Sequence, residues 1–467
     1  MKRYNVLFLF SDQHNAKCLS CAGHPDVRTP HLDELASRGV RFSRAYANNP
    51  ICTPSRMSYL SGLYPSTHGY YGLYGVEPPE PMTSVFSWFR ANGYRTGALG
   101  KLHTPRYWIE RECDFLYDEF IEYPKYLEGA GLYDLNDNRA FTGKRDGSVS
   151  KIPFEHSCEY ALYEQTRRFL RNQGEPADRT KETTPFFGWV SFSRPHQPYV
   201  ASEPYASMYP PQSVTLPPGA SEANDTPDGK YRALPETKLR RYLSSYLGLV
   251  SQVDASIGLI LEELKTLGLA DSTIVVYAGD HGDYAGEHGR IEKKGGISHR
   301  AICEVPLIVV HPEAEGVGRV DRSIVESVDL FPTLCELSSI SVPSTVQGRS
   351  FAGLLTPSAP SVAPRDSALT ENAYRKSIAT ERYRYVSNIG DQPDELYDIE
   401  QDPWELHNLV GEPEYEKQVA EMSRLLLRRV STARKPRTTI NGFWHEHAYD
   451  EDLRIDLTRS GNENEYW

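Results

Sequence analysis

Short apolar runs alternate with amphipathic helical patterns over the first 350 residues of the chain. Residues 6–10 are all apolar, which predicts a buried strand. Residues 29–39 have a proline near the start, apolar side chains at helical spacing and a closing glycine, which predicts a helix. A longer helical pattern over residues 253–264 precedes a second apolar run at residues 274–277. This alternation predicts an α/β fold with a mainly parallel sheet sandwiched by helices.

The pattern changes after a proline-rich segment at residues 356–365, which is the best candidate for a domain boundary. Three short strands and one amphipathic helix are expected beyond it, at residues 377–380, 383–387, 395–399 and 414–430. We therefore predict an α/β domain over residues 1–360. A smaller C-terminal subdomain, an antiparallel sheet plus a helix, is predicted over residues 366–467 and includes a polar, aromatic tail from residue 435.

Composition and charge exclude several classes of protein. The 467 residues are 39% hydrophobic and 24% charged, the balance of a globular protein. A net charge of -12 opposes a nucleic-acid partner. No run reaches the ~18 apolar residues of a membrane helix, and residues 6–10 are shorter than the apolar part of a signal peptide. We therefore expect a cytoplasmic protein with no nucleic-acid and no membrane partner.

The seven cysteines are an odd number spread over a long chain, which does not indicate a disulfide framework. Cys18 and Cys21 have the spacing of a redox or zinc motif, but no second pair completes a zinc site. We interpret them as two half-buried thiols.

Polar side chains directly follow four predicted strands. They are Asp12 and Gln13 after residues 6–10, Lys101 and His103 after residues 94–99, His196 after residues 186–192, and Asp280, His281, Lys293 and Lys294 after residues 274–277. Ligands of open α/β sheets bind at the carboxyl ends of the strands, so these side chains are expected to meet. Cys52 adds a fifth segment, because it precedes a predicted helix start whose free N–H groups favour an anion.

Together these residues make sense as one site for a tetrahedral oxyanion ester. A divalent cation could be held by Asp12, Gln13, Asp280 and His281. A cationic cage beside it would consist of Arg56, Lys101, His103, His196 and Lys293. Metal and cage would neutralise charge on the non-bridging oxygens while a nucleophile attacks in line. Each residue alone also has a structural interpretation as a turn, a cap or a packed side chain, and it is their convergence that favours a site.

Residues 52–69 read CTPSRMSYLSGLYPSTHG and closely resemble the signature of type I sulfatases, C-x-P-x-R followed by S-x-L-x-G-x-Y-P-x-x-H-G. Further segments follow in the order of that family: GKLH at 100–103, PHQP at 195–198, GDHG at 279–282, VPLI at 305–308 and ELYD at 395–398. The resemblance spans nearly the whole chain. It implies an alkaline-phosphatase-like fold and a sulfuric ester hydrolase that cleaves an aryl or carbohydrate sulfate to an alcohol and sulfate.

The resemblance also implies that Cys52 is oxidised to formylglycine by a formylglycine-generating maturation enzyme. The modified Cys52 would join the metal ligands, and Arg56 would hold the modified side chain. Lys101, His103 and Lys293 would bind the sulfate, and His196 would protonate the leaving alcohol. A hydrated aldehyde suits this chemistry, since one hydroxyl attacks sulfur and the second then expels sulfate as the aldehyde re-forms.

Two departures from the usual family pattern leave alternatives open. Gln13 stands where many sulfatases have a second Asp, and His281 stands where many have an Asn. Ca²⁺ is the family's usual ion, but a mixed shell also admits Mn²⁺ or Mg²⁺. The same residue pairs resemble phosphonate monoester hydrolases and phosphodiesterases, which are the enzymatic alternative. A non-catalytic binding protein on the same fold is the second alternative.

Three further points stay open at this stage. Counting from Asp280 favours Lys293 as the sulfate-binding lysine, whereas counting back from Val305 favours Lys294. Residues 107–150 and 202–234 are the expected pocket walls, and their aromatic and acidic side chains suit a sugar ring. The aromatic tail leaves a homo-oligomer open.

Overall fold

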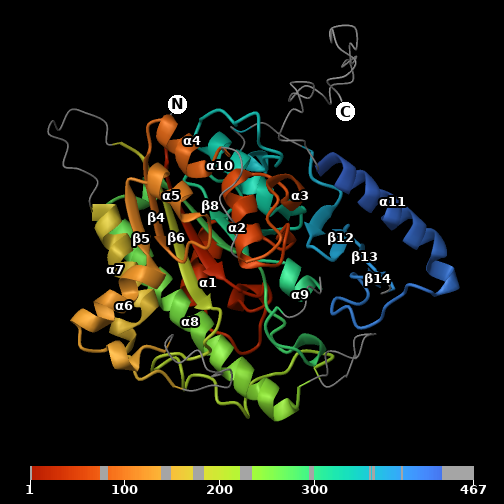
Figure 1. The fold of residues 1–467 in the computed structure, drawn as a ribbon, viewed down its shortest axis with the longest axis horizontal. Helices are drawn as coiled ribbons and strands as arrows, with labels where there is room; N and C mark the ends of the chain where they lie inside the picture. Colours follow the sequence, from red (N-terminus) through yellow and green to blue (C-terminus); the bar gives the residue numbers. More distant parts are fainter. Residues whose placement is uncertain are drawn as a thin grey trace, which may run out of the picture.

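The computed structural model describes residues 3–73, 82–137, 149–171, 184–220, 234–293, 299–356, 359, 363–390 and 393–433. Its main sheet has eight strands (Figure 1). In sheet order they are β5 (Phe115–Asp118), β4 (Arg95–Gly100), β6 (Phe186–Pro195), β1 (Asn5–Asp12), β7 (Thr273–Gly279), β8 (Leu307–Val310), β2 (Val40–Phe42) and β9 (Arg319–Asp321). Only β8 runs antiparallel to its neighbours in this sheet, so the predicted mainly parallel α/β fold is confirmed.

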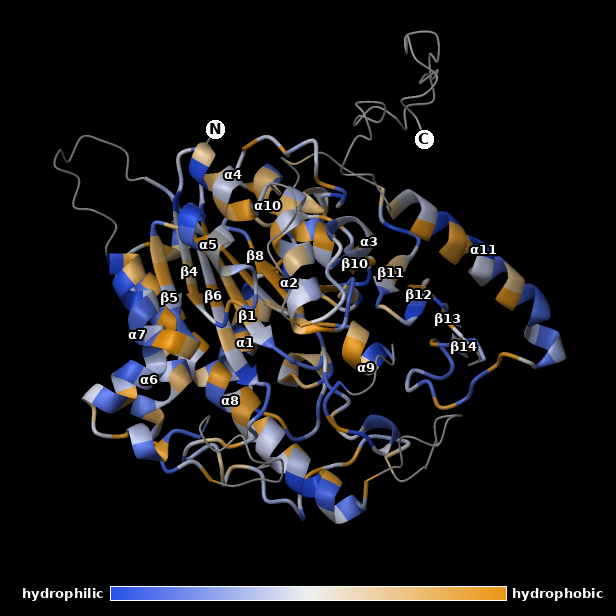
Figure 2. Ribbon diagram, viewed as in Figure 1, coloured by the Kyte–Doolittle hydropathy of each residue, from blue (hydrophilic) through white to orange (hydrophobic). Residues whose placement is uncertain are grey.

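The position of strand β1 in the middle of the protein explains why its sequence is continuously apolar. Both of its faces are buried, with Phe8 and Phe10 in one hydrophobic core and Leu7 and Leu9 in the other. The first core contains side chains of α2 (Cys52–Ser61), α4 (Val85–Ala91), α5 (Arg106–Glu112) and α10 (Leu330–Leu337). The second contains side chains of α1 (Pro30–Arg38), α7 (Cys158–Arg171) and α8 (Glu236–Thr266). Figure 2 shows the apolar strands enclosed by these helices.

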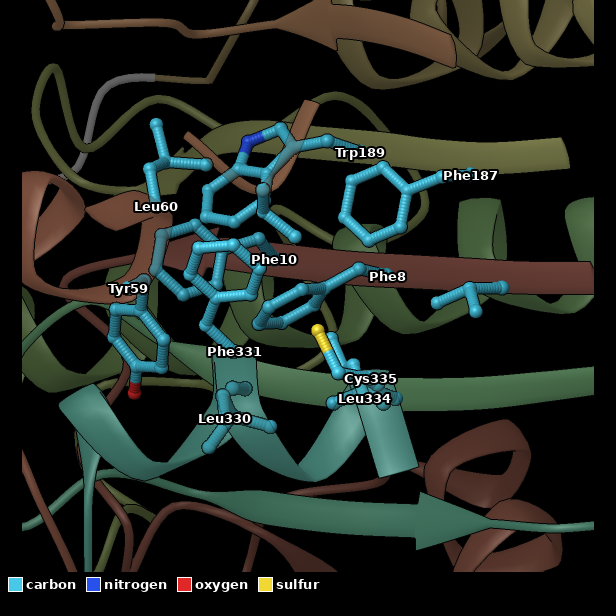
Figure 3. Close-up of a cluster of buried hydrophobic side chains, with 14 of the residues drawn as sticks. Phe8, Phe10, Tyr59, Leu60, Phe187, Trp189, Leu330, Phe331, Leu334 and Cys335 are labelled. Atoms are coloured by element: carbon cyan, nitrogen blue, oxygen red, sulfur yellow. The ribbon is translucent and has the colours of Figure 1, made fainter. Parts of the chain in front are cut away.

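An aromatic cluster fixes α2 and α10 against the centre of the sheet. Figure 3 shows Phe8 and Phe10 packed beside Trp189 of β6, and the ring centroids of these pairs are 4.7 and 4.6 Å apart. Tyr59 of α2 makes an edge contact with Phe10 and donates a hydrogen bond from its hydroxyl to the carbonyl of Gly279 (3.0 Å). The helix that begins at Cys52 is therefore attached both to β1 and to the end of β7.

Helix α8 is the longest helix in the described part of the chain. By length and composition it is also the one described helix that could cross a membrane, but 83% of its most apolar window is buried inside the protein. It packs against α1, α7 and β6. This is the arrangement of a core helix, in agreement with the predicted pattern at residues 253–264.

The C-terminal part forms a separate four-stranded antiparallel sheet covered by one helix. Its elements are β11 (Ala368–Glu371), β12 (Arg375–Ala379), β13 (Tyr383–Asn388), β14 (Glu395–Asp398) and α11 (Glu416–Ala433). The predicted sheet and helix are confirmed, and β11 is an additional strand. The peptide N–H of Glu371 donates to the carbonyl of Asn48, which joins β11 to the first part of the chain. The boundary near residue 360 stays a prediction, and the tail from residue 435 lies outside the described residues.

The remaining short elements connect these layers. They are β3 (Ala45–Tyr46) paired with β10 (Val325–Glu326), and the helices α3 (Pro65–His68), α6 (Glu119–Gly129) and α9 (Arg300–Cys303). Strands β4, β6, β1 and β7 are adjacent and parallel, so their carboxyl ends lie at one edge of the sheet. The polar residues that follow these four strands therefore start from neighbouring positions.

Candidate active site

Four buried side chains converge at the carboxyl edge of the sheet. Asp12, Cys52, Asp280 and His281 each offer one ligand atom, and these atoms all lie within 4.8 Å of one another. Asp12 ends β1, Cys52 is the first residue of α2, and the other two follow β7. The predicted meeting of distant segments at one point is thus observed in the structure.

Gln13 lies beside this group with its backbone and side chain both bonded. Its φ of +64° turns the chain sharply after β1. Its peptide N–H donates to Oδ1 of Asp280 (2.9 Å). Its side-chain nitrogen Nε2 donates to Oδ2 of Asp283 (2.6 Å) and to the hydroxyl of Tyr199 (2.8 Å). Sequence reasoning missed Asp283 and Tyr199, although Asp283 lies only two residues after His281.

The ring of His281 is oriented as a ligand. Its Nδ1 lies 2.9 Å from the carbonyl of Gly282, which accepts a hydrogen bond from the N–H form of that nitrogen. Nε2 is therefore turned into the site, 3.3 Å from Sγ of Cys52 and 3.6 Å from Oδ1 of Asp280. Burial favours the neutral ring, but the carboxylate of Asp280 raises the pKa of His281 above its ordinary value.

Arg56 lies one helical turn after Cys52 and is fully buried. Its Nη2 donates to Oδ2 of Asp12 (3.0 Å) and its Nε to Oδ2 of Asp280 (3.1 Å). Its Nη1 donates to the carbonyl of Lys101 and to Oγ of Ser191, both at 2.7 Å. These bonds make Arg56 a bridge between the two carboxylates. Its contact with a modified side chain at position 52 stays a prediction.

Two lysines approach the thiol of Cys52. Nζ of Lys293 lies 2.7 Å from Sγ and also 2.7 Å from Nε2 of His281. Nζ of Lys101 lies 3.9 Å from Sγ and makes an ion pair of 2.6 Å with Oδ2 of Asp12. The geometry therefore places Lys293 in the site, while Lys294 lies outside the described residues.

The charges around Cys52 decide its protonation state. Burial and the nearby Asp12 raise the pKa of the thiol, but Lys101, Lys293 and His281 outweigh them and hold the pKa well below its ordinary value. Burial likewise raises the pKa of Asp12, and the surrounding cations, Lys101 first, hold that pKa well below its usual range. The site thus stabilises negative charge at position 52 and at the end of β1.

The two predicted histidines lie at the same site. His103 hydrogen-bonds to Cys52, and its pKa is lowered first by burial and then by Lys101. Nδ1 of His196 lies 3.0 Å from the carbonyl of Gln197. Burial, followed by the charge of Lys101, lowers the pKa of His196 to about 3, so its ring is neutral near pH 7. An anionic ester beside this ring would raise the pKa again, which a proton donor needs.

The donor set fits a divalent cation. Two carboxylates from Asp12 and Asp280 and one imidazole nitrogen from His281 lie together away from solvent. Buried carboxylates this close to each other require positive charge, and burial together with Asp12 raises the pKa of Asp280 to about 6. A cation at this point would lower that pKa and so favour the ionised form of Asp280.

Comparison with known proteins identifies the family of this chain. Residues 4–340 match the sulfatase family model, which covers more than half of the chain. This chain belongs to the sulfatase family. Residues 286–432 also match the model for the C-terminal region of N-sulphoglucosamine sulphohydrolase, which includes the second sheet and α11. The predicted sulfuric ester hydrolase is confirmed at the level of the family.

Three relatives show the range of similar proteins. The chain is 31% identical to an ulvan-active sulfatase of Formosa agariphila over 88% of this chain and 78% of that protein. It is 27% identical to an arylsulfatase of Clostridium perfringens over 91% of this chain and 94% of that one. Its fold is similar to the phosphonate monoester hydrolase of Agrobacterium radiobacter, with a TM-score of 0.78, 24% identity and coverage of 92% and 96% of the two chains.

Proposed function

We propose that this sulfatase cleaves an aryl or carbohydrate sulfate monoester through a formylglycine at position 52, with the help of one divalent ion. The convergence of the ligand atoms of Asp12, Asp280 and His281 with Cys52 within 4.8 Å carries the proposal. Lys293 and Lys101 add the positive charge that a sulfate group needs. The arrangement suits an anionic tetrahedral ester better than a neutral one.

Asp12, Gln13, Asp280, His281 and the modified Cys52 would hold the ion. When bound, it would act as a Lewis acid that withdraws charge from the sulfate oxygens and favours ionisation of a formylglycine hydroxyl. We propose Ca²⁺, the family's usual ion, and Mn²⁺ or Mg²⁺ as the alternatives that the His281 nitrogen and the Gln13 amide admit. Conversion of Cys52 requires the maturation enzyme as a partner.

The remaining side chains have separate tasks in this proposal. Lys101 and Lys293 flank position 52 and would hold the sulfate oxygens by charge. His103 would donate a further hydrogen bond to the same group. His196, neutral before the ester binds, would take up a proton as the anion arrives and deliver it to the leaving alcohol.

A carbohydrate sulfate is favoured as the natural substrate. The relative from Formosa agariphila is named as active on ulvan, and it shares 31% identity with this chain. One exposed aromatic side chain of α6 also lies near the site, because the ring of Phe120 stacks on His103 with centroids 5.4 Å apart. Such rings suit the apolar face of a sugar. A homo-oligomer and a cytoplasmic localisation stay predictions.

The decisive experiment is mass spectrometry of the peptide that contains residue 52, from protein made in its native host. The expected result is an aldehyde at this position, together with turnover of an aryl sulfate. The Cys52→Ala variant, which has no thiol to oxidise, is the control and should be inactive. An unmodified thiol in a fully active enzyme would contradict the proposed nucleophile.

A phosphonate monoester hydrolase is the second candidate, because the fold is similar to such an enzyme with a TM-score of 0.78. Turnover of an aryl sulfate and of the matching aryl phosphonate monoester, measured with one preparation, ranks the two. We expect the sulfate to have the higher kcat/KM. The reverse order would assign the phosphonate activity instead.

A further inference from the structure

Asp283 is a fully buried carboxylate behind the site. Its Oδ2 accepts hydrogen bonds from Nε2 of Gln13 (2.6 Å) and from the hydroxyl of Tyr242 (2.5 Å). Its Oδ1 accepts from the peptide N–H groups of Ala285 (2.7 Å) and Glu292 (3.1 Å). Both oxygens are thus engaged by donors, and the second pair of donors is fixed in the backbone.

This arrangement fixes which end of the Gln13 amide faces Asp283. An ionised carboxylate can only accept hydrogen bonds, so the group that Gln13 turns toward Asp283 must be its nitrogen. The hydroxyl of Tyr199 accepts a second hydrogen bond from the same nitrogen. Both hydrogens of the amide are engaged in this way, so the amide oxygen is the atom that remains available to a cation.

Asp283 also reaches the opposite side of the site through the backbone. Glu292, whose N–H it accepts, has a φ of +63° and immediately precedes Lys293. Nζ of Lys293 contacts both Cys52 and His281. The carboxylate of Asp283 therefore holds Gln13 on one side and Glu292, in the turn before Lys293, on the other.

We propose that Asp283 is a positioning residue that turns the amide oxygen of Gln13 toward the cation. Many sulfatases have a second Asp at the position of Gln13, and the neutral Gln13 lacks its negative charge. Asp283, bonded to Gln13 on the side away from the cation, would supply that charge. The proposal rests on the divalent-cation site of the proposed function. It assigns to Asp283 a role through Gln13 and the turn before Lys293, with no direct contact to substrate.

A variant that reverses donor and acceptor in the hydrogen bond between Gln13 and residue 283 tests this role. In Asp283→Asn the side-chain oxygen has to face the two backbone N–H groups, so the new amide nitrogen faces Gln13. The Gln13 amide would then rotate and present its N–H group to the cation. We expect Ca²⁺ and Mn²⁺ to bind about 10- to 100-fold more weakly, the usual effect of losing a partner that orients a ligand.

The reciprocal variants complete the exchange. Gln13→Glu alone places two carboxylates in contact and should also weaken cation binding. In the double variant Gln13→Glu/Asp283→Asn, the new Asn donates to the new Glu, and the hydroxyls of Tyr199 and Tyr242 can rotate to suit. The double variant should bind the cation at least about 10-fold more tightly than either single variant.

The measurement is calorimetric titration of the metal-free proteins with Ca²⁺ and with Mn²⁺, alongside thermal unfolding in a chelator. Tyr242→Phe is the matched control, because it removes one donor to Asp283 and leaves the polarity of the Gln13 contact unchanged. Its affinity should stay within about threefold of the wild type.

The outcomes separate this inference from the proposed function. Wild-type affinity in Asp283→Asn, or a double variant no better than its parents, would overturn the positioning role. If Asp283→Asn does not fold, the comparison of Gln13→Glu with the double variant decides alone. Failure of the wild-type protein to bind either ion would instead contradict the cation site itself.

Discussion

Arg56 places a permanent positive charge between two buried carboxylates. It is fully buried and its guanidinium bonds both Asp12 and Asp280. The planar group matches two carboxylates at once, and its face lies over the ring of Phe10 at 5.1 Å. No other side chain type offers this combination of shape and permanent charge.

Replacing Arg56 by Met should therefore leave two buried carboxylates without their bridge. We expect the free energy of unfolding of the metal-free protein to fall by about 3 to 5 kcal/mol, because buried charges become uncompensated. Urea unfolding with and without Ca²⁺ measures this, and the ion should recover part of the loss. Arg90→Met, at a half-exposed ion pair with Asp114, is the control and should cost less than about 1 kcal/mol.

Glu119 predicts a pH dependence of stability. Burial first, with a contribution from Glu159, raises the pKa of its carboxyl from 4.5 to about 7, although Ser193 and Arg194 oppose the shift. The folded state then binds more protons than the unfolded state between these two pH values. Stability contributed by the neutral carboxyl is present below the lower value and is lost as pH rises through about 7.

In Glu119→Gln this loss should disappear, since the amide stays neutral and its oxygen still accepts from Ser193. The variant should gain stability over the wild type on the order of 3 kcal/mol between about pH 5 and about pH 8. Chemical denaturation at the two pH values measures the difference. Parallel pH profiles for the two proteins would show that Glu119 does not titrate in this range.

Strand ends place the functional side chains, and their close packing leaves little room for change. Gly100 ends β4 with a φ of +94°, and a Cβ at this position would lie 2.0 Å from the carbonyl oxygen of Ser191 on β6. That carbonyl also accepts the peptide N–H of Lys101 at 2.8 Å. The contact between β4 and β6 therefore fixes the backbone from which Lys101 reaches Asp12 and Cys52.

Gly100→Ala should push the end of β4 away from β6 and displace Lys101. We expect a loss of about 2 to 4 kcal/mol in stability from the overlap and the positive φ, together with a fall in kcat/KM of at least about tenfold. Thermal unfolding and steady-state kinetics measure the two effects. Gly129→Ala, where a Cβ meets nothing within 4 Å, should change neither and is the matched control.

The sequence was informative about elements whose signal is local. The runs at residues 6–10 and 274–277 are apolar because β1 and β7 are buried on both faces, and that pattern needs no neighbour to be recognised. Strand β11 has four residues and β3 only two, so their identity depends on pairing with distant segments. Pairing of this kind leaves no periodic signal in a single chain.

The residues of the candidate site likewise fall into those that the sequence predicts and those that only the structure shows. Asp12, Asp280 and Lys101 could be predicted because each lies at the end of a strand that the sequence reveals, or directly after it. Asp283 and Tyr199 could not, because their role appears only when Gln13 is seen to donate to both. Hydrogen bonds between buried side chains that are far apart in the chain depend on the complete fold. The spacing of motifs in the sequence does not predict them.

At the scale of the whole molecule, the second sheet is tied to the first part of the chain by a buried charge cluster. Arg429 of α11 donates from Nη2 to Oε1 of Glu326 (2.7 Å) and to the hydroxyl of Tyr64 (3.1 Å). Glu326 is fully buried, and Arg365 pairs with it as well. Helix α11 thereby joins β10, the residue that precedes α3 and the C-terminal sheet into one assembly.

Arg429→Met should weaken this assembly by leaving Glu326 with a single cation. We expect a loss of about 2 to 3 kcal/mol in the free energy of unfolding and a faster cleavage of the C-terminal part by protease. Arg428→Met, at the exposed neighbouring position, is the control and should stay within about 0.5 kcal/mol of the wild type. Equal behaviour of the two variants would mean that α11 is held by its apolar face alone.

The burial of Cys52 bears on the order of folding and the proposed oxidation. Cys52 is 1% exposed and is enclosed by α2, the end of β1 and two lysines from distant segments, Lys101 and Lys293. The proposed maturation enzyme would have to reach this thiol, and the folded chain leaves it almost no exposed surface. The proposed oxidation would therefore have to precede the completion of folding, and a chain that folds first would keep an unmodified thiol at position 52.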